Sequence, residues 1–86
     1  MNNDEYDFWV QMAEFLLRIQ RHPKFIPRTV SDAKKSLECI PAIKKAIRSI
    51  DDNEKYIEMI IMADENEEFL KVLVNQLKNE ENIENI

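Results

Sequence analysis

Apolar residues recur every three or four positions along most of this chain, which is the spacing of one face of an α-helix. In the first such segment the stripe consists of Phe8, Met12, Phe15, Leu16 and Ile19, and it is widened by Trp9, Val10 and Leu17. Asp4 is the expected N-cap, and His22-Pro23 ends the segment because the residue before proline is pushed out of the α region. We therefore predict a first helix over residues 4–21, with this stripe as its packing face.

A second helical segment covers residues 30–50 and contains Pro41. Thr29-Val30-Ser31-Asp32 combines a threonine cap with an acidic residue three positions later, so this segment should begin near Val30. Two alternatives remain open beyond that point. One kinked helix runs through Pro41, or two helices meet at Cys39-Ile40 with Pro41 in the first turn of the second.

The remaining helical pattern covers residues 52–80, and Asp51 is its expected N-cap because Glu54 follows three positions later. Asp64-Glu65-Asn66-Glu67 has the composition of a further helix start. We therefore expect a short break at Ala63-Asp64, with one helix before it and one after it. The polar residues 81–86 are expected to fray as a C-terminal tail.

Together these segments predict an all-α protein with a single domain over residues 1–80. We expect a small antiparallel bundle of four helices, or of five if Pro41 separates two. A hydrophobic content of 44% with 34% charged residues indicates a folded chain and not a disordered one. The chain contains no glycine, so glycine helix caps and glycine turns are excluded.

Charge is sorted along the sequence. Residues 1–17 carry four acidic and no basic side chains, residues 18–48 carry nine basic and two acidic ones, and residues 49–86 carry eleven acidic and three basic ones. A basic middle between acidic ends either folds back to neutralise itself or presents a cationic face to an anionic partner. We expect the acidic helices to lie against the basic middle.

The residue types that carry enzyme chemistry are scarce. His22 and Cys39 are single in the chain and lie seventeen positions apart, so no Cys–His pair is indicated. Cys39 is expected to be a small buried side chain, and His22 to interact favourably with a helix C-terminus. No spacing of acids and histidine matches a metal site, and a phosphate-binding loop requires glycine. The sequence therefore predicts no enzyme activity, no metal and no cofactor.

Apolar residues that exceed the needs of a thin core predict a protein-binding surface instead. Tyr6, Phe8 and Trp9 are candidate anchors, because aromatic residues are enriched at the energetic centres of interfaces. Phe25 and Ile26 are further candidates, since the flanking prolines stiffen their connector and lower the cost of ordering it. In the alternative interpretation, Phe25 plugs one end of the bundle and the aromatic residues of the first helix cap the core.

The basic middle supports a different hypothesis, in which the chain binds nucleic acid. Two short helices joined by a tight turn over residues 29–50 would be similar to a helix-turn-helix motif. The nucleic-acid-binding candidates are Lys34, Lys35, Lys44, Lys45 and Arg48. In the simpler interpretation, these cations are the solvated side of an amphipathic helix.

The sequence favours a small non-enzymatic protein-binding or regulatory module that binds a protein partner and can self-associate as a homo-oligomer. Its Ile-, Lys- and Asn-rich composition is typical of AT-rich genomes, and by analogy a phage or plasmid factor acting on a host protein fits such a chain. The single cysteine and the absence of a long apolar run predict a cytoplasmic protein with no membrane association. The nucleic-acid-binding helical domain is the alternative.

Overall fold

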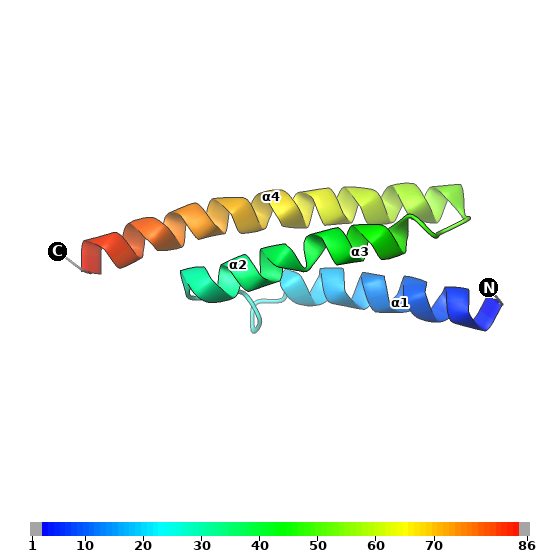
Figure 1. Ribbon diagram of the computed structural model, residues 1–86, viewed down its shortest axis with the longest axis horizontal. Coiled ribbons are helices and arrows are strands. Elements are labelled where there is room, and N and C mark those ends of the chain that lie inside the picture. The colour runs from blue at the N-terminus through cyan, green and yellow to red at the C-terminus, as the bar shows by residue number, and fades with distance from the viewer. Residues whose placement is uncertain (1–2, 85–86) are drawn as a thin grey trace.

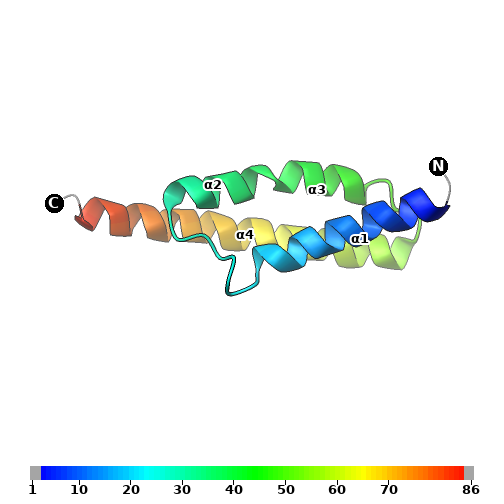
Figure 2. The ribbon, with the colours of Figure 1, turned by 90° about the horizontal axis from the view of Figure 1, so that it is seen from below.

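A computed structural model describes residues 3–84 of the chain, with the side chains of residues 8–82 among them. The described part contains four helices: α1 (Asn3–Gln20), α2 (Val30–Glu38), α3 (Ile40–Ile47) and α4 (Asn53–Glu84). They lie as three rods, because α2 and α3 follow each other end to end as one middle rod that packs beside both α1 and the long α4 (Figures 1 and 2). The α1 and α4 helices run in the same direction, and α2 and α3 run in the opposite one (Figures 1 and 2). The all-α prediction is confirmed, whereas an antiparallel bundle of four or five separate helices is not.

The middle rod begins and is interrupted where the sequence indicates. Thr29 Oγ1 accepts a hydrogen bond of 3.1 Å from the Asp32 N–H, which confirms the predicted start near Val30. The rod is interrupted at Cys39, and α3 starts with Pro41 in its first turn. Proline is tolerated there because the first N–H groups of a helix have no partner within the helix. Of the two alternatives at Pro41, the structure shows two helices.

The α4 helix is continuous, so the predicted break at Ala63-Asp64 is wrong. Residues 53–84 contain neither proline nor glycine, and nothing in the backbone chemistry interrupts this helix. Its N-cap is Asp52 and not Asp51, because Asp52 Oδ1 accepts a hydrogen bond of 3.1 Å from the Lys55 N–H. The helix extends through Glu84. Residues 85–86 lie outside the described part, and fraying of the tail stays a prediction.

The stripe that was predicted as the packing face of α1 is mostly exposed. Asp4 lies inside this helix and not at its cap, since the backbone is already helical at Asn3. Ala13, Leu17 and Gln20 form the buried side, while Phe8, Met12, Phe15 and Leu16 are exposed. A helix whose apolar residues cover more than half of its circumference has no single packing face that periodicity can identify. The side with the small Ala13 packs inward, because a methyl group lets the neighbouring helices approach closely.

The core consists of two clusters arranged along α4. The main cluster joins α1, α3 and the first half of α4, and its buried members are Ala13, Leu17, Ile40, Ile43, Ile47, Ile50, Met59, Ala63 and Leu70. The second cluster lies where α2 packs on the second half of α4, and its buried members are Ala33, Val74 and Leu77. Since α1 ends before it reaches the second cluster, only two rods form that part of the molecule (Figure 1).

A buried polar network connects three helices at the C-terminal end of α1. Asn66 Nδ2 donates hydrogen bonds to Leu17 O at 2.8 Å and to Gln20 Oε1 at 3.1 Å. Gln20 Nε2 donates to Ser36 O at 3.0 Å. The Arg21 N–H donates to Arg18 O, so the Leu17 carbonyl is available to Asn66. Asn66 therefore caps the C-terminus of α1 from within α4, and such caps satisfy carbonyls that a helix end leaves unpaired.

Ion pairs join the helices at the edge of the core. Lys44 Nζ of α3 lies 2.8 Å from Asp64 and 3.4 Å from Glu67, both on α4. The hydrogen bond to Asp64 raises the pKa of Lys44 above its ordinary value, and Glu67 adds to this effect. Lys55 Nζ of α4 lies 3.0 Å from Glu14 of α1. The basic middle therefore contacts the acidic C-terminal part through Lys44, as the charge pattern suggests.

The molecule is long and thin, and this leaves much of its surface open. It measures 56 × 19 × 18 Å, with a radius of gyration of 15.1 Å. A compact domain of 86 residues would have a radius of gyration of about 12 Å. Its accessible surface of 6383 Å² exceeds the value of about 5,400 Å² expected for a compact monomer of this mass. About 1,000 Å² of surface that a compact fold would bury is therefore exposed.

Candidate functional site

The most distinctive surface of the molecule lies on the outer side of α1. We call it the α1 face, and it consists of Phe8, Trp9, Met12, Phe15 and Leu16. Each of these side chains is between 37% and 58% exposed. Phe8 and Trp9 contact each other edge to face, with ring centroids 5.3 Å apart. The face is therefore a connected apolar surface on one helix and not a set of scattered residues.

The α1 face continues into a groove between α1 and α3. This groove has a volume of 260 Å³, and its lining includes Trp9, Met12 and Leu16 on one side and Ala42 and Ala46 on the other. Alanine side chains keep the α3 wall low, so a bulky apolar side chain has room to enter. A second hollow of 320 Å³ lies on the outer side of the helix, where Met12 again forms part of the lining. Met12 thus lies at the centre of the whole surface.

The area of the α1 face is large for a molecule of this size. Since one aromatic side chain covers about 150–250 Å², the exposed fractions of the five residues amount to roughly 500 Å². The largest apolar patch of a typical monomer measures about 300–600 Å² and is often functional. The α1 face reaches the upper part of this range on a chain of only 86 residues.

The structure places the predicted anchors in two separate regions. Trp9 is half exposed and belongs to the α1 face. The side chain of Tyr6 lies outside the described residues. Phe25 and Ile26 lie in the connector beyond the opposite end of α1, which is at least about 16 Å from Trp9 along the helix. The predicted candidates therefore do not form one site.

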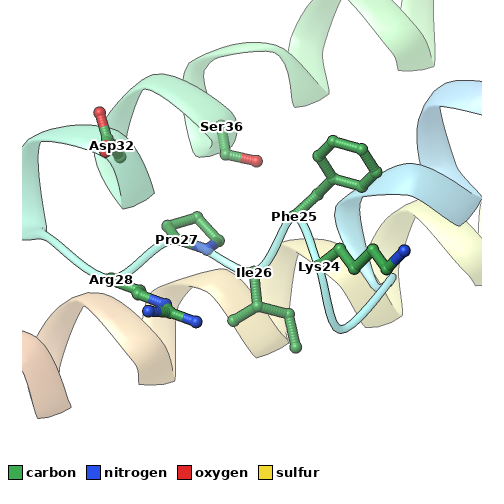
Figure 3. A pocket seen from close by; sticks show the side chains of 7 residues that line it. All are labelled: Lys24, Phe25, Ile26, Pro27, Arg28, Asp32 and Ser36. Atoms are coloured by element: carbon green, nitrogen blue, oxygen red, sulfur yellow. The ribbon is translucent and has the colours of Figure 1, made fainter.

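The connector is an open loop and not a plug for the bundle (Figure 3). Phe25 is 59% exposed, so the interpretation in which it closes the end of the core is wrong. Its ring lies 5.6 Å from that of His22, measured between centroids. Phe25 and Ile26 point to opposite sides of the loop, beside a shallow hollow of 400 Å³ (Figure 3). They do not make one apolar surface, and a docking role for Phe25 stays a prediction.

The five basic candidates differ in how available they are. Lys44 is held by Asp64 and Glu67, as described above. The other four are exposed and make no ion pair within the described part of the chain; they are Lys34, Lys35, Lys45 and Arg48. The α2 and α3 helices follow one rod (Figure 2), whereas the helices of a helix-turn-helix motif cross at about 90–120°. The nucleic-acid hypothesis therefore rests on charge alone.

Side chains that carry chemistry are dispersed over residues 8–82. No group of three or more His, Cys, Asp or Glu side chains in this part of the chain is arranged to hold a metal ion. His22 Nδ1 accepts a hydrogen bond of 3.2 Å from the Lys24 N–H, just after the end of α1. Cys39 is exposed and lines the groove, so the expectation that it is buried is wrong. It is exposed because it lies at the junction of α2 and α3 on the side that α1 only partly covers.

Sequence reasoning missed most of the residues that form this surface. Met12, Phe15 and Leu16 were assigned to a packing face because they share a helical stripe, yet they are exposed. One sequence signal could have indicated their exposure: this helix carries more apolar residues than a thin core can bury. Asn66 and Gln20 were also missed, because a polar residue in an amphipathic helix is normally placed on the solvated side.

Comparison of the chain with protein-family models, with curated proteins and with solved structures finds no match. Within the described residues, no helix combines the length and the apolar character that crossing a bilayer requires. The geometry of the molecule itself therefore carries the functional argument.

Proposed function

We propose that this chain is a small non-enzymatic protein-binding module and that it docks a partner protein through the α1 face. The observation that carries this proposal is the connected apolar surface of roughly 500 Å² on one helix. The apolar residues of α1 cover both the side that faces the core and the α1 face, and an apolar helix surface is normally buried. In α1 one side is buried by this chain, and a partner protein covers the other.

The energetics of this surface support the proposal. Covering apolar surface is the main favourable contribution to most protein association, and roughly 500 Å² of it is exposed on the α1 face. The aromatic residues Phe8, Trp9 and Phe15 are the side chains from which we expect the largest contributions to binding.

The test is affinity capture from a lysate of the protein's own source with three baits. The first bait is the unaltered chain, the second carries Phe15→Lys in the α1 face, and the third carries Ile57→Lys as a matched control. Ile57 is about as exposed as Phe15 but lies on the outer side of α4. Far-UV circular dichroism first checks that both variants are folded. Each lysate is divided into a nuclease-treated and an untreated half.

The proposal expects a discrete protein that the unaltered chain and Ile57→Lys retain after nuclease treatment and a high-salt wash. Phe15→Lys should lose it, because a lysine in the interface places an unpaired charge in an apolar environment. Equal retention by all three baits would show that the α1 face is not the docking surface.

A single cysteine suits a reducing compartment, and we place the protein in the cytoplasm on this basis.

The alternative proposal is nucleic-acid binding through the exposed cations of α2 and α3. It is supported by Lys34, Lys35, Lys45 and Arg48, which are exposed and unpaired within the described residues. Phosphate binding predicts that the logarithm of the affinity falls with the logarithm of the salt concentration, with a slope of about one per phosphate contacted. Lys45→Glu with Arg48→Glu should then abolish binding. Loss of all captured material on nuclease treatment would favour this alternative over protein docking.

A further inference from the structure

The α1 face is symmetric about one of its own residues. Met12 is its centre, Trp9 and Phe15 lie three positions on either side, and Phe8 and Leu16 lie four positions on either side. If two copies of α1 pack antiparallel across a two-fold axis at Met12, each apolar residue of one copy meets an apolar residue of the other. A two-fold interface requires this self-complementarity, because the same surface serves both partners.

The charges beside the face have the matching arrangement. A polar stripe follows the helix at alternating spacings of three and four residues, and it consists of Asp4, Asp7, Gln11, Glu14, Arg18 and Arg21. The stripe borders the α1 face, since Gln11 and Phe15 line a common hollow with Glu14 and Arg18. It begins with acids and ends with arginines, and its centre lies between Gln11 and Glu14. This centre is within one residue of Met12.

An antiparallel second copy is therefore complementary in charge as well as in shape. It brings position 7 beside Arg18 of the partner, whereas the guanidinium of Arg21 lies over the Phe69 ring of its own chain, 4.7 Å from the ring centroid. A parallel two-fold copy would place the two stripes on opposite sides of the helix pair, where their charges could not meet. Arg18 has the freedom to make such a contact, because 69% of its side chain is exposed although it pairs with Glu14 within its own helix. The charge order of α1 thus selects one direction of pairing.

The area agrees with the size of a stable interface. Two copies of the α1 face remove roughly 1,000 Å² of apolar surface from water. The polar stripes and the low α3 wall of each groove add to this area. Stable interfaces bury about 1,200–2,000 Å² in total, so the apolar contact alone supplies most of the area that the smallest of them need. The open surface of the elongated monomer, about 1,000 Å² above that of a compact chain, has the same magnitude.

We propose that the partner of the α1 face is a second copy of this chain, with its α1 antiparallel to the first across a two-fold axis at Met12. This inference rests on the proposed function, because it names the occupant of the same surface. A heterologous amphipathic helix is the competing occupant. Such a partner has no need of the symmetric spacing along α1, whereas the self-complementarity of a two-fold interface depends on it.

Sedimentation equilibrium of the full chain tests the stoichiometry. The unaltered protein should sediment at twice the 10.3 kDa of one chain. Met12→Lys should weaken the dimer at least about 30-fold, because the axis brings the two new charges together at the centre of the interface. Ile57→Lys on the outer side of α4 should leave the dimer unchanged. Circular dichroism confirms that each variant is folded.

Disulfide crosslinking tests the direction and the register, in a chain whose own thiol is removed by Cys39→Ser. Met12→Cys should crosslink with itself across the axis, since a disulfide needs its two Cα atoms within about 7 Å. Phe8→Cys and Leu16→Cys should each remain uncrosslinked alone and should form a mixed product when combined. A product from Phe8→Cys alone, as abundant as the mixed one, would show parallel pairing and overturn the proposal.

The outcomes separate this inference from the proposed function. A monomer up to roughly millimolar concentration would overturn the second copy as the occupant. If Phe15→Lys then still abolishes capture of a different protein, the α1 face docks that protein and the proposed function stands. If the chain is monomeric and capture is insensitive to Phe15→Lys, both proposals fail. A dimer that Met12→Lys leaves intact would place the interface elsewhere and also overturn the inference.

Discussion

The buried network around Asn66 gives the sharpest prediction about what stabilises this fold. Asn66 is 3% exposed and donates to Leu17 O and Gln20 Oε1. Asn66→Ala removes both hydrogen bonds, and each contributes about 1 kcal/mol net. The substitution also leaves Leu17 O and Gln20 Oε1 without the amide donor. This costs about a further 1–3 kcal/mol where no water molecule replaces the donor. We expect a total loss of about 2–5 kcal/mol, depending on whether water replaces the lost donor.

This loss is large for the molecule. A domain of 86 residues has a free energy of unfolding of about 4–13 kcal/mol, so the variant should lose a substantial fraction of it. Urea denaturation followed by circular dichroism measures the change, at one fixed protein concentration because self-association shifts apparent stability. Asn75→Ala is the matched control on the exposed side of the same helix. It should change stability by no more than about 0.5 kcal/mol.

A double-mutant cycle checks that the network itself is responsible. Gln20→Ala and Asn66→Ala remove groups that contact each other, so their effects should differ from additivity by more than about 0.5 kcal/mol. The reasoning is refuted if Asn66→Ala destabilises the protein no more than Asn75→Ala does. Additive effects of the two network substitutions would show that the hydrogen bond between Asn66 and Gln20 contributes little.

Three further predictions follow from single contacts, and urea denaturation measures each of them. Thr29→Ala should cost about 1 kcal/mol, because it removes the N-cap of α2, and an unchanged midpoint would contradict this role. Leu70→Ala should cost about 2–5 kcal/mol, because Leu70 is fully buried. Val72→Ala is the control: Val72 is half exposed, and its loss should change stability by less than about 0.5 kcal/mol. Equal effects of the two substitutions would show that the burial is misassigned. The ion pairs of Lys44 should contribute up to about 1 kcal/mol to the free energy of unfolding below about pH 10.4. Because the folded state raises the pKa of Lys44, this contribution should be lost as the pH rises further. A stability difference between the unaltered chain and Lys44→Met that does not shrink as the pH rises above about 10.4 would contradict that assignment.

The sequence predicts the boundaries of the middle rod well because those boundaries depend on local chemistry. Thr29 caps α2 through its own hydroxyl group, and the proline at position 41 fits only the first turn of α3. The predicted break in α4 failed for the opposite reason. Asn66 was interpreted as part of a helix start, but its side chain donates a hydrogen bond to the Leu17 carbonyl of α1, which is far away in the sequence. Local patterns contain no information about such a partner.

The orientation of α1 shows the same limit for the candidate site. Helical spacing groups Met12 with Phe15 correctly, yet it does not determine whether that group faces the core or the solvent. The inward side was decided by the fit of Ala13 and by the hydrogen bonds of Gln20, which only the assembled fold defines. Trp9 was predicted as an anchor because the first helix carries more apolar residues than a thin core can bury, and the composition of the helix shows this excess. Phe8 was predicted as an anchor on the same basis, whereas the exposure of Met12, Phe15 and Leu16 became apparent only in the structure.

The central claim is that the α1 face is covered by a protein, and site-specific photocrosslinking in cells of the protein's own source tests it most directly. A photoreactive phenylalanine analogue replaces Phe15 on the α1 face in one strain and Val72 on the outer side of α4 in another. Irradiation should give a discrete protein adduct from position 15, at twice the mass of the chain if the partner is a second copy. Position 72 should give little or none. Adducts of equal abundance from both positions, or none from position 15, would contradict the account.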